Sequence, residues 1–203
     1  IYRAHLLTNG YCMDREKVDR FKELKIGRVH LTIDGPEEIH NKRRPHLKNN
    51  DSFATIVKNL DYLMSKREEF DINIVIRVNI DGTNEDGYAE LYKYLIRRYP
   101  KQPMTIYPGF VKEHFGSCNS APDELLDRRM QADFTLRQFK EHGIPGLNFF
   151  PEISEQECMA RHVNSYLVDP RGNLYKCWTD IGMEDKAVGN VTGKGGLNNK
   201  VLT

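Results

Sequence analysis

The sequence has few cysteines, no long apolar run and almost no net charge. Four cysteines in 203 residues are too few for a disulfide scaffold. The densest apolar stretch, residues 72–80, is interrupted by Asn73, Arg77 and Asn79 and falls short of the roughly 18 apolar residues that a membrane span needs. With 30 basic and 29 acidic side chains, the net charge of +1 gives no reason to expect a nucleic acid or an anionic membrane surface as partner.

The composition that remains is typical of a folded protein of modest size. The chain is 39% hydrophobic and 10% aromatic, which argues against disorder. At about 100–200 residues per domain, its length predicts one domain or one and a fraction. It begins at Ile1 without an initiator Met and has no signal-peptide pattern. We therefore expect an internal fragment of a larger protein from a reducing, cytoplasmic compartment.

Strand and helix patterns alternate over the first 150 residues. Strands are predicted at 2–8, 28–34, 72–80, 103–111 and 147–150. Helices are predicted after Asp14 up to Gly27, from Ser52 onwards, over 85–99, and from Pro122 to about His142, with a polar basic loop over 37–50. Strands separated by helices imply parallel βαβ units with right-handed crossovers. The predicted fold class is α/β, a partial (β/α) barrel over residues 1–150.

The remaining residues, 151–203, have a different pattern that is richer in Gly and Asn. Their clearest element is a hairpin with strands at 166–168 and 174–178 and a turn over 169–172. We expect a second, small region here.

Polar residues occupy one face of the central predicted strands. Within 72–80 every second residue from Ile72 is apolar and should pack on helices, which turns Arg77 and Asn79 toward the barrel interior. The same alternation turns His30, Thr32 and Asp34 inward. Because α/β proteins bind ligands at the carboxyl ends of their strands, this cluster suits a charged small molecule. The alternative is a structural ion pair between Arg77 and Asp34.

Several short motifs in order resemble one enzyme family. They are Thr8-Asn9-Gly10-Tyr11, Thr32-Ile33-Asp34-Gly35-Pro36, His40-Asn41 with Arg44, and, in the tail, Cys158 followed after thirteen residues by Gly172 and then Cys177. Together they resemble radical S-adenosylmethionine (SAM) enzymes with a SPASM extension, which mature peptides and proteins. Thr32 stands where the family usually has Ser, and Asn41 where it usually has Asp.

The chain also departs from the family pattern. Its cysteines, at positions 12, 118, 158 and 177, contain no Cys-x(3)-Cys-x(2)-Cys loop for the catalytic [4Fe–4S] cluster, and the later SPASM cysteines are missing. The resemblance therefore implies a fragment that is inactive by itself. Trp178 follows the second SPASM cysteine, where sulfatase-maturing members have an Asp base, and this disfavours sulfatase maturation.

The resemblance implies a chemistry for the parent protein: S-adenosylmethionine bound on a [4Fe–4S] cluster yields a 5′-deoxyadenosyl radical that takes hydrogen from a peptide or protein substrate. The implied cofactor-binding residues are Asn9, Gly10, Thr32, Asp34, Arg44, Arg77 and Asn79. Cys158 and Cys177 are the implied metal ligands, of an auxiliary cluster. The fragment itself is expected to bind no cofactor, and no catalytic residue is assigned.

Individual roles follow from the chemistry of each side chain. The planar guanidinium of Arg77 suits the carboxylate of the cofactor. Arg44, or its neighbour Arg43, is the alternative ligand of the same carboxylate. By the resemblance, Thr32 would bond the amino-acid end and Asn79 the ribose. Asp34 and the Asn9-Gly10 pair could instead be structural turn residues. Cys158 and Cys177 could instead be small buried hydrophobic side chains.

Two other functions remain open. One is a non-catalytic peptide-binding or scaffold module with the same barrel fold; a natural start near Ile1 favours it, whereas an upstream Cys-x(3)-Cys-x(2)-Cys favours the enzyme. The other is an ordinary βα-barrel enzyme, for which the sequence shows no nucleophilic Lys or metal-ligand set. The sequence does not predict the oligomeric state.

Overall fold

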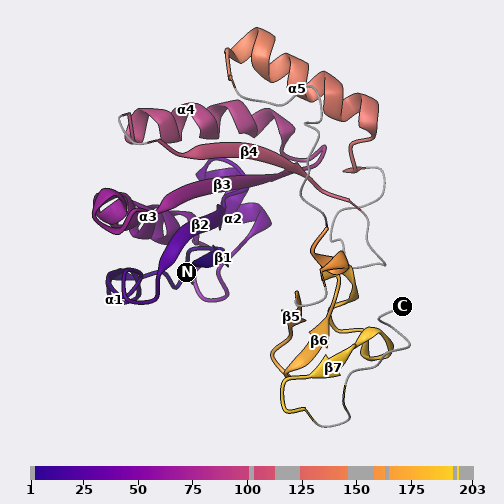
Figure 1. The fold of residues 1–203 in the computed structure, drawn as a ribbon. Helices are drawn as coiled ribbons and strands as arrows, with labels where there is room; N and C mark the ends of the chain where they lie inside the picture. The colour runs from indigo at the N-terminus through magenta and orange to yellow at the C-terminus, as the bar shows by residue number, and fades with distance from the viewer. Residues whose placement is uncertain are drawn as a thin grey trace. The chain divides into compact units, whose positions relative to one another are not determined.

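The computed structural model describes residues 3–100, 103–112, 124–145, 158–162, 165–193 and 196. The chain divides into two compact units, Ile1–Phe149 and Phe150–Thr203, and each is described by itself. Figure 1 shows both units.

The first unit contains a four-stranded parallel sheet in the order β1-β2-β3-β4 (Figure 1). Its strands are β1 (Ala4–Thr8), β2 (Ile26–Thr32), β3 (Asn73–Ile80) and β4 (Thr105–Phe110). Its helices are α1 (Arg15–Asp19), α2 (Glu37–Arg43), α3 (Phe53–Phe70), η1 (Glu85–Gly87), α4 (Tyr88–Arg98) and α5 (Arg128–His142). Parallel strands that follow one another in chain order, with helices between them, confirm the α/β class and are consistent with a partial barrel.

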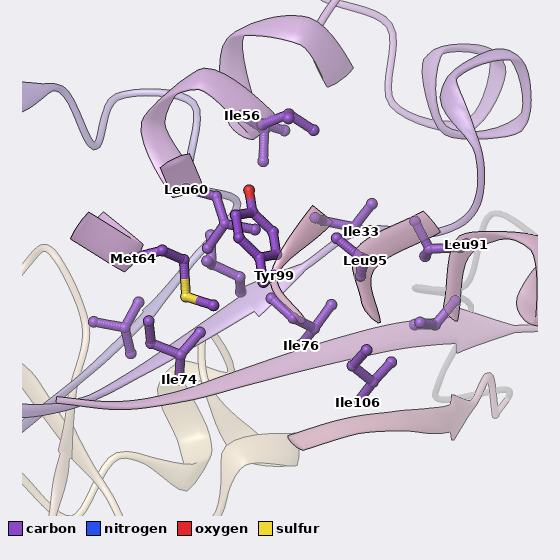
Figure 2. Close-up of a cluster of buried hydrophobic side chains, with 14 of the residues drawn as sticks. Ile33, Ile56, Leu60, Met64, Ile74, Ile76, Leu91, Leu95, Tyr99 and Ile106 are labelled. Carbon is purple, nitrogen blue, oxygen red and sulfur yellow. The ribbon is translucent and has the colours of Figure 1, made fainter. Parts of the chain in front are cut away.

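One face of this sheet carries the hydrophobic core. The even-numbered residues of β3 and the residue before it are all buried by at least 98%: Ile72, Ile74, Ile76, Val78 and Ile80. They pack with the apolar sides of α3 and α4, and Figure 2 shows Ile74 and Ile76 beside Leu60, Met64 and Leu95. The opposite face is more open, with Leu7 of β1 60% exposed and Arg77 only half-buried. The period-two alternation therefore predicted the faces of β3 correctly.

The segment predicted as a basic loop contains a helix. Over Glu37–Arg43 the acidic residues Glu37 and Glu38 lie in the first turn and basic residues lie in the last, which matches the helix dipole. His40 is fully buried, so one side of this helix packs inward. The charges of this segment therefore stabilise a helix rather than marking a solvated loop.

Helix α3 is capped by a residue distant from its start. Ser52 occupies the N-cap position, but its side chain makes no capping bond. Instead Asn41 Oδ1 accepts hydrogen bonds from the backbone N–H groups of Ser52 and Phe53, each at 3.0 Å. Ser52 Oγ donates to the Arg44 carbonyl at 2.6 Å. Because Asn41 belongs to α2, no local pattern around Ser52 predicts this cap.

Two helix starts depend on aspartates. Asp14 caps α1 as predicted, accepting from Lys17 N, but the helix ends at Asp19, well before the predicted end at Gly27. Asp127 caps α5 by accepting from Met130 N at 2.8 Å. The predicted start at Pro122 and the predicted strand at 147–150 lie outside the described residues.

The second unit contains a small antiparallel sheet in the order β5-β6-β7, formed by Leu167–Val168, Asn173–Tyr175 and Gly189–Asn190. Asp169 accepts from the backbone of Arg171 and Asn173, and Gly172 has φ +84°, so the turn forms where the sequence predicts it. Three short 3₁₀ helices accompany the sheet: η3 (Met159–Arg161), η4 (Trp178–Asp180) and η5 (Glu184–Lys186). Trp178 lies in η4, so the predicted strand to residue 178 is too long.

Candidate functional site

The open face of the sheet brings polar residues from three strands into line. The strand register places Thr32 of β2, Arg77 of β3 and Tyr107 of β4 next to one another, and Asn79 opposite Gly109. Thr32, Arg77 and Asn79 are half-buried and lie on the face away from the core. These three predicted ligands therefore share the carboxyl half of the sheet.

Arg77 lies in a slot that a glycine makes possible. A Cβ atom at Gly109 would lie 2.2 Å from Arg77 Nε and 2.9 Å from Cζ, so the guanidinium packs on bare backbone. Arg77 Nε is buried without a hydrogen-bond partner, and no ion pair joins Arg77 to a carboxylate in the described part of the chain. A partly buried cation without a counter-charge is costly, and an anionic ligand would offset that cost.

A side-chain bridge crosses the same face below Arg77. His30 Nε2 on β2 lies 2.9 Å from the Tyr107 hydroxyl on β4, and the ring centroids are 5.6 Å apart. In the register His30 lies opposite Val75 and Tyr107 opposite Arg77, so the bridge crosses β3 diagonally between these two residues; Val75 is 98% buried although it belongs to the open face. Burial, followed by the charges of Arg77 and Arg28, lowers the pKa of His30, so the imidazole is neutral at pH 7. Sequence analysis missed Tyr107, whose only signal was its alternate position in the predicted strand.

Asp34 pairs with Arg44 and not with Arg77, so the predicted alternative of an Arg77–Asp34 pair is wrong. Its Oδ2 accepts from Arg44 Nε at 2.6 Å, and its Oδ1 accepts from Asn79 N at 3.0 Å. Asp34 is 98% buried. Because its bonds connect the end of β2 to α2 and β3, this carboxylate stabilises the carboxyl edge of the sheet.

The structure separates the two neighbouring arginines. Arg43 donates to both carboxylate oxygens of Asp81, at 2.9 and 2.8 Å, and to Thr83 Oγ1 at 2.6 Å. Arg44 makes its Asp34 bond through Nε, and its side chain is 38% exposed. No hydrogen bond to a described residue is recorded for its terminal nitrogens. Arg43 is therefore committed to the fold, whereas Arg44 retains donors for a ligand.

Two buried residues that sequence analysis did not assign hold this edge together. Asn84 donates to the carbonyls of Asp34 and Asn79, at 2.7 and 2.8 Å, and accepts from Asp81 N at 3.0 Å. His40 Nδ1 accepts from Asp34 N at 3.1 Å, and burial lowers the pKa of His40 to about 4. Neutral His40 therefore carries its proton on Nε2. Asn84 has no sequence signal beyond its position after a strand, and His40 was part of a motif of the family resemblance but had no assigned role.

Asn9 and Gly10 follow β1 at the same carboxyl edge. Gly10 has φ +78°, and a Cβ there would lie 2.4 Å from Leu31 Cδ2. Asn9 Oδ1 accepts from Tyr11 N, and Asn59 of α3 donates to the carbonyls of Gly10 and Tyr11, each at 2.9 Å. Turn geometry and packing explain both residues, and a cofactor role for them stays a prediction.

The predicted metal ligands lie in the second unit. Cys158 is exposed, Cys177 is half-buried with its Sγ 3.1 Å from Thr179 Oγ1, and neither forms a disulfide. Since neither thiol is buried, the alternative of two small buried hydrophobic side chains is wrong. The described residues include no group of three or more His, Cys, Asp or Glu suited to a metal ion, and Cys118 lies outside them. A cluster-binding role for Cys158 and Cys177 stays a prediction.

Membrane insertion has no support among the helices. None of those in the described part of the chain is both long enough and apolar enough to cross a bilayer.

Comparisons with solved structures show what this fold resembles. The chain is similar to native anSMEcpe with bound AdoMet (TM-score 0.62), and to the same protein with bound AdoMet and Cp18Cys peptide (0.65) or Kp18Cys peptide (0.64). These proteins are anaerobic sulfatase-maturating radical SAM enzymes of the SPASM type. Each match has 18% sequence identity and covers 98% of this chain but only 56% of the other.

The α/β fold that the sequence resemblance implied is therefore confirmed, because the chain is similar to about half of a radical SAM enzyme; the SPASM-like hairpin over residues 151–203 stays a prediction. No family model matches the sequence. No curated protein matches it.

Proposed function

We propose that the open face of the first unit is the S-adenosylmethionine site of a radical SAM enzyme that modifies a peptide or protein. The slot at Gly109, where Arg77 holds a buried and unpartnered Nε, carries the proposal. It lies on a sheet whose fold resembles structures with bound AdoMet.

The residues at this edge fit the chemical groups of that cofactor. Arg77 offers a guanidinium fork to a carboxylate, and the terminal nitrogens of Arg44 are a second donor group nearby in the fold. Thr32 supplies a hydroxyl beside Arg77, and Asn79 supplies an amide suited to ribose hydroxyls. Asp34 orients Arg44 through its Nε bond rather than contacting the ligand. When bound, the cofactor supplies the radical that takes a hydrogen atom from the substrate.

The catalytic cluster must come from elsewhere in the parent protein. The chain contains no Cys-x(3)-Cys-x(2)-Cys sequence, and three thiolates in one short loop are what such a cluster requires. We therefore propose that this chain alone does not cleave S-adenosylmethionine. Anaerobic iron–sulfur reconstitution followed by an assay for 5′-deoxyadenosine tests this, and cluster-dependent product from this chain would contradict it.

The proposed substrate is a peptide or protein. Two of the similar structures have bound peptides, and the open face of this chain presents the neutral His30–Tyr107 pair as a polar surface next to the cofactor site. Trp178 is 60% exposed and has no group that accepts a proton. We therefore propose that the modified peptide is not a sulfatase, although the similar structures are sulfatase-maturating enzymes.

Equilibrium binding tests the cofactor site. In the complete parent protein with its cluster, isothermal titration of S-adenosylmethionine should give weaker binding for Arg77→Ala than for the unmodified protein, by about 1.5–3 kcal/mol for a lost charged hydrogen bond. Arg28→Ala is the matched control, because Arg28 is exposed on the same strand face near the other end of β2. Equal affinity in all three proteins would refute the site.

The alternative is a non-catalytic peptide-binding or scaffold module, and the missing cysteine loop is the observation that favours it. The full reading frame distinguishes the two functions. An upstream Cys-x(3)-Cys-x(2)-Cys supports the enzyme, and a frame without one supports the module.

A further inference from the structure

The amino-terminal end of the sheet, opposite the proposed cofactor site, contains two neighbouring pockets. The first has a volume of about 360 Å³ and is lined by residues near the starts of β1, β3 and β4 and in the last turn of α3, among them Arg3, Arg67, Asp71, Asn73 and Thr105. The second, of about 270 Å³, shares Arg3 and is also lined by Lys22 and Lys25. We call the first one the basic pocket.

The charges around these two pockets are unbalanced. Arg3, Arg67, Lys22 and Lys25 contribute four cations, and Asp71 is the one carboxylate in the two linings. A concave surface lined mainly by one sign of charge concentrates the field and attracts ligands of the opposite sign. The whole chain has a net charge of +1, so this excess is local.

Arg3 is held in place at the mouth of the basic pocket. Its Nη2 donates to the Asp71 carbonyl at 3.1 Å and to Asp71 Oδ2 at 2.8 Å. Its stem lies across bare backbone, since a Cβ at Gly27 would lie 1.9 Å from Arg3 Nε. Asp71 is 92% exposed and offsets part of the charge of Arg3, so Arg67 is the cation of the lining whose charge is not balanced by a described carboxylate.

Arg67 is the cation without a protein partner. Its Nε is buried and has no hydrogen-bond acceptor, and no ion pair is recorded between Arg67 and a described carboxylate. Buried guanidinium N–H groups are nearly always satisfied by protein, water or ligand. Asn73 and Thr105, both exposed in the lining, add neutral donors next to it. The pocket therefore has donors and positive charge in excess of its acceptors.

From this arrangement we propose that the basic pocket binds the oxyanion of a small molecule, a phosphate or a carboxylate, between Arg67 and Arg3. The ligand accepts from the Arg67 guanidinium, and Asn73 and Thr105 supply further hydrogen bonds. This site lies at the other end of the strands from Arg77 and is independent of the proposed cofactor site.

Titration with inorganic phosphate and with succinate at low ionic strength, followed by amide chemical shifts, tests the proposal. Saturable binding in the millimolar range is expected, with shifts at Asn73 and Thr105, and Arg67→Met should weaken it by about tenfold or more. Arg129→Met on α5 removes the same charge at an exposed position and should leave binding unchanged. Binding of phosphate alone assigns a phosphate ligand, and binding of succinate alone assigns a carboxylate.

Two results would overturn the proposal. One is the absence of saturable binding by either anion; the other is equal binding by Arg67→Met and the unmodified protein, which would indicate an adventitious ion only. Arg67→Lys, which retains the charge but loses the fork, should bind with intermediate affinity and guards against a variant that merely fails to fold. Far-UV circular dichroism of each variant checks the fold directly.

Discussion

Substituting Gly109 by alanine tests the Arg77 slot without removing the arginine. The added methyl would lie 2.2 Å from Nε and 2.9 Å from Cζ and Nη2, which is closer than atoms approach. The backbone of Gly109 is not among those at positive φ, so alanine fits the strand, and β4 keeps its register with β3. The side chain of Arg77 must therefore move, while the sheet remains.

Gly109→Ala should weaken cofactor binding but should not lower the free energy of unfolding. Displacing the guanidinium should remove a charged hydrogen bond to the cofactor carboxylate, worth about 1.5–3 kcal/mol, or roughly 10- to 150-fold in Kd. Glycine inside a strand costs about 0.5–1 kcal/mol relative to alanine, so the free energy of unfolding should stay constant or rise slightly. Calorimetric titration of the complete parent protein with S-adenosylmethionine measures the change in Kd, and urea unfolding measures the change in stability.

A double-mutant cycle shows whether the effect passes through Arg77. If Gly109→Ala acts only by displacing that side chain, it should cost nothing further in an Arg77→Ala background. Additive losses in the double variant, or unchanged affinity in Gly109→Ala alone, would refute the slot as the reason for the glycine.

Three further predictions concern His40, Asn41 and the two cysteines of the second unit. The pKa of His40 falls from 6.5 to about 4 on folding, so between these pH values the unfolded chain binds a proton that the folded chain does not. The free energy of unfolding should therefore be fully present above pH 6.5 and decline by up to about 3 kcal/mol as the pH falls to 4. Urea unfolding of His40→Asn should lack this decline. Asn41→Ala should lower stability by about 0.5–2 kcal/mol in thermal denaturation through loss of the α3 cap; Asn41→Asp keeps the acceptor but places a carboxylate against Asp51 Oδ1, to which Asn41 Nδ2 donates at 3.3 Å, and should recover only part of that loss. In the complete parent protein, replacing Cys158 or Cys177 with Ala should lower the iron content, and unchanged iron would defeat the assignment of these thiols as ligands.

The sequence was sufficient for features that depend on local periodicity. The alternation in β3 predicted both its helix-packed face and the placement of Arg77 on the opposite face, because a strand has only two faces and a slip of one residue would exchange them. Asp14 was predicted at a helix start from its residue type, and the backbone N–H that it accepts from, that of Lys17, is only three residues away. These interactions are short in sequence, so a pattern encodes them.

The features that sequence analysis missed depend on contacts between distant residues. Nothing near Ser52 indicates that Asn41 caps its helix, and nothing near Arg43 indicates that Asp81, 38 residues later, takes both its terminal nitrogens. Two adjacent arginines look equivalent in a sequence, and only the folded chain separates their roles. The same holds for Asn84, whose bonds reach back 50 residues to Asp34.

The His30–Tyr107 bridge has a mechanical consequence for the edge of the sheet. Adjacent strands lie about 4.8 Å apart, so a bond from β2 to β4 reaches across two spacings and passes over the strand between them. Among the described residues β4 is the last strand in the order of this sheet, and the bridge attaches it to β2 in addition to its backbone ladder with β3. Separating β4 from β3 requires breaking the His30–Tyr107 hydrogen bond as well as the backbone ladder, and it exposes Val75. We therefore expect β4 to detach cooperatively rather than residue by residue.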